Sequence, residues 1–228
     1  CAPDEITRSH TVLPDRWGYY GKAGLFIFPA VFNPGAGAFS EGLAAAQPHG
    51  ATNFGYIDKR GVFVIEPRFD NAEAFSEQFA AVNVAGKWGF IDHRGNPVIP
   101  PQFEAVGSFS NGYATFSLDG KTGYIDKTGR ISIAPKFSDA APFSEGLAAV
   151  CCEDGKTGYI DKTGVFIVPP IYPAGVRVAG PFSEGIALVL ADSGPIYIDR
   201  SGHVVAPVIQ DSPGPHGKGI FLTVDGAH

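Results

Sequence analysis

The sequence of 228 residues predicts an all-β fold that is built from repeats. A four-residue turn of the form Asp-x-x-Gly recurs along the chain, and two of its closing glycines, Gly95 and Gly129, stand 34 residues apart. In the clearest copy, the three short apolar runs 80–84, 88–92 and 97–100 are separated by two tight polar turns, the second of which is of this form. The chain also contains 30 Gly and 19 Pro, and no stretch shows a sustained helical period. Self-similarity at this period indicates a repeat architecture, and this composition is typical of short strands and turns.

Each repeat unit begins with a crossover that reads Phe-Ser-Glu-Gly in its most regular copies. We expect the phenylalanines to be packing anchors between units, each contributing roughly 1.5–3 kcal/mol through burial. A strand rich in alanine follows, which suits a crowded place where strands converge. The crossovers begin at Phe39, Phe75, Phe109, Phe143 and Phe182.

The next predicted strand contains a glycine that is usually flanked by aromatic residues. Such a glycine usually marks a bulge, or a close approach of another backbone or ring. The steps are Trp17-Gly18-Tyr19, Phe54-Gly55-Tyr56, Trp88-Gly89-Phe90, Thr122-Gly123-Tyr124 and Thr157-Gly158-Tyr159.

The Asp-x-x-Gly turn then closes a hairpin. Its Asp side chain can accept from a backbone N–H two residues on, and its Gly would adopt a left-handed conformation. The run after each turn ends at a proline, which cannot donate to a strand ladder and therefore indicates a strand end or a sheet edge. The turns are 58–61, 92–95, 126–129, 161–164 and 199–202, with a degraded copy at 21–24.

The two chain ends differ from the regular units and complement each other. Residues 1–15 lack the repeat and are expected to form an N-terminal tether or arm, which leaves residues 16–228 as a single repeat domain. The first unit lacks an alanine-type strand, whereas residues 216–226 line up with the crossover and the strand that follows it.

Pairing of Ile220–Val224 with the first hairpin, Arg16–Pro29, would remove an open sheet edge. The sequence therefore predicts a six-bladed β-propeller closed by the C-terminal strand, with the alanine-type strands lining its channel. An open β-solenoid of stacked hairpins is the alternative.

The pattern KWGFID, VIPP and FSEGLAAV resembles the WG-repeat (KWG repeat) family of bacterial proteins. The resemblance covers roughly residues 16–224 and is strongest over 75–170. It is weak in the outer units, where Gly21 replaces the turn Asp and Ile196 replaces the strand Gly. The resemblance implies a repeat β-protein, often exported or attached to other modules, and it implies no defined reaction.

The net charge of −6 argues against nucleic acid as a partner. Cys1 is the first residue, as in a mature bacterial lipoprotein, although an arbitrary boundary would look the same. We expect Cys1 to be lipidated and the protein to be exported, either periplasmic or an outer-membrane lipoprotein. Any membrane contact would then be through that lipid anchor.

Residues with the spacing of a catalytic or metal site are scarce. No phosphate-binding glycine loop, nucleophile elbow or zinc-protease motif occurs. The turn aspartates recur in every regular unit, so folding explains them without catalysis. The sequence predicts no cofactor, no metal ligands and no catalytic residues.

One repeated set of polar residues is a candidate ligand site at the channel mouth. Such a ring could bind a cation, a basic peptide or sugar hydroxyls, although Ser-Glu can also simply shape an exposed turn. Trp17 and Trp88 could stack on a sugar or pack between units. The ring comprises Glu41, Glu77, Asn111, Glu145, Glu184 and Lys218.

These features favour a non-catalytic binding scaffold of the bacterial cell envelope that engages a protein or a glycan. A carbohydrate-binding propeller with one site per blade is the second hypothesis, because aromatic residues repeat. A hydrolase or lyase acting at the channel mouth is the third.

Overall fold

The computed structural model describes residues 7–10, 17–20, 26–33, 36–173 and 179–207. Within these ranges the secondary structure consists of twenty-one β-strands and no helix, so the described part has no helix that could cross a membrane. The all-β prediction is confirmed. The strands form six antiparallel sheets, which follow one another along the chain.

Three of the sheets have three strands each. The first comprises β1 (Thr7–His10), β2 (Trp17–Tyr20) and β3 (Phe26–Phe32). The second comprises β4 (Ala44–Ala46), β5 (Phe54–Ile57) and β6 (Phe63–Phe69). The sixth comprises β19 (Ile186–Ala191), β20 (Gly194–Asp199) and β21 (Val204–Pro207).

The three sheets between them have four strands each. The third comprises β7 (Asn71–Ala72), β8 (Ala80–Val84), β9 (Lys87–Ile91) and β10 (Pro97–Phe103). The fourth comprises β11 (Ala105–Val106), β12 (Tyr113–Leu118), β13 (Lys121–Asp126) and β14 (Ile131–Phe137). The fifth comprises β15 (Asp139–Ala140), β16 (Leu147–Cys151), β17 (Thr157–Asp161) and β18 (Phe166–Tyr172).

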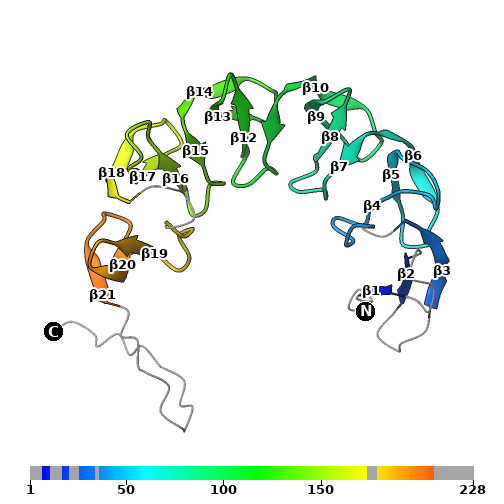
Figure 1. The fold of residues 1–228 in the computed structure, drawn as a ribbon, viewed down its shortest axis with the longest axis horizontal. Coiled ribbons are helices and arrows are strands. Elements are labelled where there is room, and N and C mark those ends of the chain that lie inside the picture. Colours follow the sequence, from blue (N-terminus) through cyan, green and yellow to red (C-terminus); the bar gives the residue numbers. More distant parts are fainter. Residues whose placement is uncertain (1–6, 11–16, 21–25, 34–35, 174–178, 208–228) are drawn as a thin grey trace, which may run out of the picture.

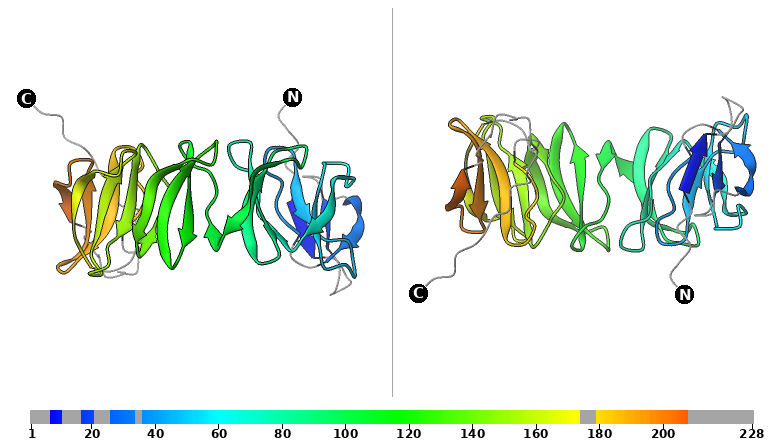
Figure 2. Two further views of the ribbon diagram at one scale, coloured as in Figure 1. Left: turned by 90° about the horizontal axis from the view of Figure 1, so that it is seen from above. Right: turned by 90° about the horizontal axis from the view of Figure 1, so that it is seen from below.

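The sheets are arranged like blades around an arc, with the first and sixth sheets at its two ends (Figure 1). Seen from above or below, the strands run from one face of the arc to the other (Figure 2). Strands β10 and β14 lie on the convex side, and the strand order β10-β9-β8-β7 places β7 on the concave side. Each sheet therefore has an outer strand and an inner strand.

The alanine-type strands do not line the concave side in the four-stranded sheets, which corrects the prediction. The two-residue strands β7, β11 and β15 pair with β8, β12 and β16 and lie inside them. Small alanine side chains suit these strands because both strand faces are covered: β16, for example, is buried at all five positions.

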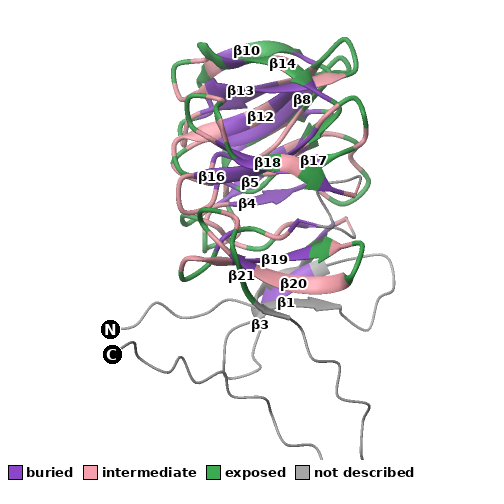
Figure 3. Cartoon of the chain, turned by 90° about the vertical axis from the view of Figure 1, so that its left-hand side faces the viewer, coloured by how far each residue is buried: buried purple, intermediate pink, exposed green. Residues whose placement is uncertain are grey.

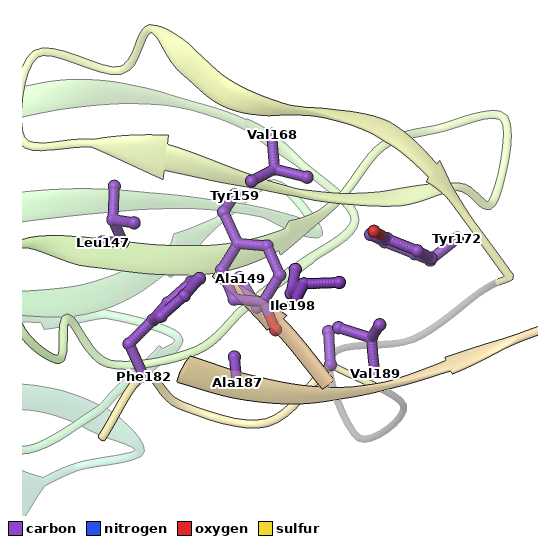
Figure 4. Close-up of a cluster of buried hydrophobic side chains, with 10 residues drawn as sticks. Leu147, Ala149, Tyr159, Val168, Tyr172, Phe182, Ala187, Val189 and Ile198 are labelled. Atoms are coloured by element: carbon purple, nitrogen blue, oxygen red, sulfur yellow. The ribbon is translucent and has the colours of Figure 1, made fainter. Parts of the chain in front are cut away.

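Among the residues that the structure describes, the hydrophobic core is divided into five clusters, one between each pair of successive sheets. In the cluster between the fifth and sixth sheets, Tyr159 extends toward Ala187 beside Phe182 (Figure 4). Buried residues are concentrated in the strands, and exposed residues in the turns and outer strands (Figure 3). Because four of the five crossover phenylalanines are only 1% exposed, their predicted role as packing anchors is confirmed.

The strand glycines allow the outer strand to cross closely over its neighbour. A Cβ atom at Gly123 would lie 2.5 Å from the main-chain oxygen of Ile133, and the register between β13 and β14 breaks at this point. The predicted close approach is therefore confirmed. In the sixth sheet Ile196 takes the place of this glycine and pairs with Pro207; the register with β21 is regular from Ile196 to Tyr197 and shifts only between Tyr197 and Ile198.

Closure of the ring is not seen among the described residues. The strand predicted to close it, Ile220–Val224, lies outside them, as does most of the expected arm 1–15. Four residues of that arm, Thr7–His10, form β1 and pair with β2. Strand β3 occupies the other edge of β2, so neither edge of β2 is open for the predicted pairing with the C-terminal strand.

Candidate functional site: the turn rim

Two kinds of turn lie at the same end of the sheets, because neighbouring strands run antiparallel. The crossover turns precede β4, β8, β12, β16 and β19, and the Asp-x-x-Gly turns follow β5, β9, β13, β17 and β20. We call the face of the arc on which these strand ends and turns lie the turn rim. It carries all the predicted ring residues that the structure describes: Glu41, Glu77, Asn111, Glu145 and Glu184.

Each crossover turn is a two-residue hairpin loop. The backbone N–H of Ser40 donates to Leu43, and that of Leu43 donates back, at 2.9 and 3.0 Å. Both central residues have positive φ, 49° at Glu41 and 87° at Gly42, which is the signature of a type I′ turn. Glycine suits the second position because it meets no steric cost at positive φ.

The carboxylates of the crossover turns hold the next turn along the rim. Glu41 accepts from the backbone N–H of Gln78 at 3.0 Å, and Glu77 accepts from that of Gly112 at 2.9 Å. Glu145 accepts two such bonds from the turn that contains Glu184. Each carboxylate therefore links its own sheet to the following one.

Basic side chains from the Asp-x-x-Gly turns reinforce these links. Lys127 lies 3.1 Å from Glu77, and His93 lies 3.2 Å from Glu41. Burial raises the pKa of Glu77, but hydrogen bonds from Lys127 and the turn backbone outweigh it and hold that pKa below its ordinary value. In the later sheets the basic groups donate to main-chain oxygens instead: Lys162 to Asn111 and Arg200 to Glu145.

The crossover serines form a second series of links between sheets. Each hydroxyl donates to the main-chain oxygen of the next crossover phenylalanine, at 2.6 to 2.8 Å. The pairs are Ser40 with Phe75, Ser76 with Phe109, Ser110 with Phe143 and Ser144 with Phe182.

The Asp-x-x-Gly turns have the predicted geometry. Asp126 accepts from the backbone N–H groups of Thr128 and Arg130 at 2.9 and 3.1 Å, and Gly129 has a φ of 82°. The hydroxyl of Thr128 donates at 2.6 Å and, together with these backbone bonds, holds the pKa of Asp126 below its ordinary value. The same pattern recurs at Asp161 and Asp199.

Sequence reasoning missed a third link, made by the tyrosine after the strand glycine. Tyr56, Tyr124 and Tyr159 are fully buried, and their hydroxyls donate at 2.7 to 2.8 Å to main-chain oxygens two residues before the next crossover phenylalanine. Burial raises the pKa of each phenol. The repeated Tyr two residues before the turn Asp was the available signal, since a buried phenol needs a partner.

The other predicted site residues do not join the rim cluster. Trp88 packs, partly buried, against the cluster between the third and fourth sheets. The structure does not describe the side chain of Trp17. Lys218 and the lipidation candidate Cys1 also lie outside the described residues. No group of three or more His, Cys, Asp or Glu residues in the described part could hold a metal ion.

Sheets arranged around an arc and linked by repeated turns define a propeller-like repeat protein. The model of the WG containing repeat matches residues 54–88, 88–121, 123–156 and 158–193. These matches span more than half of the sequence, so the chain belongs to the WG-repeat family.

Solved structures show the same kind of fold. The computationally designed Ika8 protein is 14% identical with a TM-score of 0.58, over 84% of this chain and 67% of that one. BamB from Moraxella catarrhalis is 13% identical with a TM-score of 0.53, over 88% and 77%. AztD from Citrobacter koseri is 16% identical with a TM-score of 0.53, over 84% and 66%. At such identities the likeness shows the fold alone. A search of curated proteins found no match.

Proposed function

We propose that this chain is a non-catalytic interaction scaffold that binds a protein partner along the convex edge of its last two sheets. The main observation in support is a set of exposed aliphatic side chains on the outer strands of the last two sheets. Ile167 and Ile171 of β18 and Val204 and Val205 of β21 are between 41% and 62% exposed. We call these four residues the outer-strand surface. Exposed apolar groups that gather on one side of a soluble protein favour protein association.

The partner would contact side chains rather than extend the sheets. Strands β18 and β21 are sheet edges, and an open edge can accept a further strand. Pro169, Pro170 and Pro207 lie in these strands, and they lack the N–H groups that a continuous ladder needs. A folded partner with an apolar patch therefore fits this surface better than an extended peptide.

The turn rim is less favourable as the binding surface. The carboxylates of Glu41, Glu77 and Glu145 already accept hydrogen bonds from the next sheet, so a cation or basic peptide would have to compete with them. Trp88 packs against an inter-sheet cluster, so less of its ring is free to stack on a sugar. We therefore favour a protein over a glycan as the partner.

Site-specific photo-crosslinking tests this proposal. A crosslinker at Ile171 is expected to give one discrete protein adduct in the native host, whereas a crosslinker at Val64 on β6, also exposed and apolar, is the matched control. With the purified partner, Ile171→Asp should weaken binding at least tenfold and Val64→Asp should not. Specific glycan binding without a protein adduct, or turnover of a substrate, would refute the proposal.

A further inference from the structure

The last sheet has an apolar face that no described sheet covers. Leu188 and Leu190 of β19 are each 44% exposed, and Tyr197 of β20 lies opposite Leu188 and is half-buried. The equivalent residues of the fifth sheet, Ala149 and Tyr159, are 3% and 0% exposed because the sixth sheet packs on them. We call Leu188, Leu190 and Tyr197 the terminal face.

The phenol at this face lacks the partner that its counterparts have. The hydroxyl of Tyr159 donates to the main-chain oxygen of Gly180, just before the crossover that follows, at 2.8 Å. The hydroxyl of Tyr197 makes no hydrogen bond in the described part of the chain. A crossover packed on the terminal face would supply the missing oxygen.

Two rim groups of the last crossover are also unused within the described ranges. Ser144 and Glu145 bond to the backbone of the crossover that follows them, Ser144 at 2.7 Å and Glu145 through both carboxylate oxygens. Their counterparts Ser183 and Glu184 have no such partner there. The sixth sheet therefore presents a hydrophobic patch, a phenol donor, a hydroxyl donor and a carboxylate acceptor in the arrangement that binds a crossover elsewhere.

The chain carries one further crossover sequence, in residues 211–224, which lie outside the described residues. Gly214-Pro215 corresponds to Gly180-Pro181, and Lys218-Gly219 corresponds to the turn pair Glu184-Gly185. The lysine at this turn would place a positive charge beside the unused carboxylate of Glu184.

We propose that residues 211–224 of this same chain dock on the terminal face as an additional crossover. The main-chain oxygen of Gly214 accepts from Tyr197, and Phe221, the counterpart of Ala187, covers Leu188. This inference rests on the fold and is independent of the proposed partner surface, which lies on the outer strands.

A pair of matched substitutions in the full-length chain tests the proposed hydrogen bond of the Tyr197 hydroxyl. Tyr159→Phe removes a hydrogen bond that the structure shows, so it calibrates the loss in melting temperature. Tyr197→Phe should lower the melting temperature by a comparable amount if residues 211–224 are docked. The native Phe90 at this position of the third sheet indicates that Phe is tolerated sterically. An unchanged melting temperature for Tyr197→Phe would overturn the proposal.

Hydrogen exchange tests the docking itself. The amides of 219–224 should be protected in the full-length chain at low concentration, and Leu188→Glu should abolish this protection while β8 and β9 stay protected. Leu118→Glu, at an exposed leucine of the fourth sheet, should leave it intact. Free exchange over 219–224 in the wild-type chain would refute the proposal, as would protection that appears only when a dimer forms, since a second copy would then be the occupant.

Discussion

Gly123 and Gly112 are both glycines of the repeat, but the fold needs them for different reasons. A Cβ atom at Gly123 would lie 2.5 Å from the main-chain oxygen of Ile133 and 2.7 Å from the nitrogen of Pro135. A Cβ atom at Gly112 would meet nothing within 4 Å, but its φ is 88°. The first position excludes a side chain by contact with a backbone, and the second penalises one through its dihedral angle.

Adding one methyl group at each position separates these two effects. We expect Gly123→Ala to cost about 3 kcal/mol of unfolding free energy, because the obstructing atoms belong to the backbone and cannot rotate away. Gly112→Ala should cost about 1 kcal/mol, from strain at positive φ alone. Chemical denaturation measures both values. Equal costs would show that β14 can move away from Gly123.

The turn aspartates make the stability depend on pH in the acid range. The hydroxyl of Thr128 and two backbone N–H groups lower the pKa of Asp126 in the folded state. An unfolded Asp titrates near pH 3.9, so this stabilisation is complete above about pH 4 and is lost as the pH falls through the lower folded value. Asp126→Asn should therefore reduce the fall in melting temperature below about pH 4.

Asp192→Asn is the control for this substitution. Asp192 is exposed in the turn between β19 and β20 and accepts no hydrogen bond from the described residues. Its variant should follow the wild-type profile of melting temperature against pH. A wild-type profile for Asp126→Asn as well would contradict the role given to the turn carboxylate.

At the scale of elements, the sequence predicted the parts of the repeat whose causes are local. The Asp-x-x-Gly turns depend on bonds within five residues, and they form as expected. Strand β1 was missed because Thr7–His10 shows no apolar pattern, and β7, β11 and β15 were missed because two residues cannot show alternation. The links made by the rim carboxylates join residues more than thirty positions apart, so only the packing of successive sheets reveals them.

One crossover turn departs from the pattern of its sister turns. Gln78 occupies the second position of its type I′ turn with a φ of 79°, where Gly42 and Gly112 occur in others. We expect Gln78→Gly to stabilise the chain by about 1 kcal/mol, because glycine relieves the strain and keeps the N–H that donates to Glu41. Part of this gain will be offset by the greater freedom of glycine in the unfolded chain.

The reciprocal change is the control for this turn. Gly42→Gln places the same side chain at a φ of 87°, where a Cβ atom meets nothing within 4 Å. It should destabilise the chain by a similar amount in equilibrium denaturation. If Gln78→Gly were destabilising, then the Gln78 side chain would make a favourable contact that outweighs its backbone strain.

At the scale of the whole molecule, the six sheets of the described ranges are joined by five inter-sheet clusters and by the links along the turn rim. The repeat period predicted the number of sheets, because each unit supplies one. It could not determine closure, which depends on the curvature between successive sheets. Stability in such an arrangement is approximately a sum of sheet and nearest-neighbour terms, so a change at one end should stay local.

Hydrogen exchange on a chain that lacks residues 211–228 tests this nearest-neighbour arrangement most directly. We predict that any loss of protection is confined to β19, β20 and β21, while β8, β9, β12 and β13 exchange as slowly as in the full-length chain. A closed ring would behave differently, because removing its closing strand opens the sheets on both sides of the joint. Accelerated exchange throughout β8, β9, β12 and β13 would contradict the nearest-neighbour arrangement and favour the closed ring.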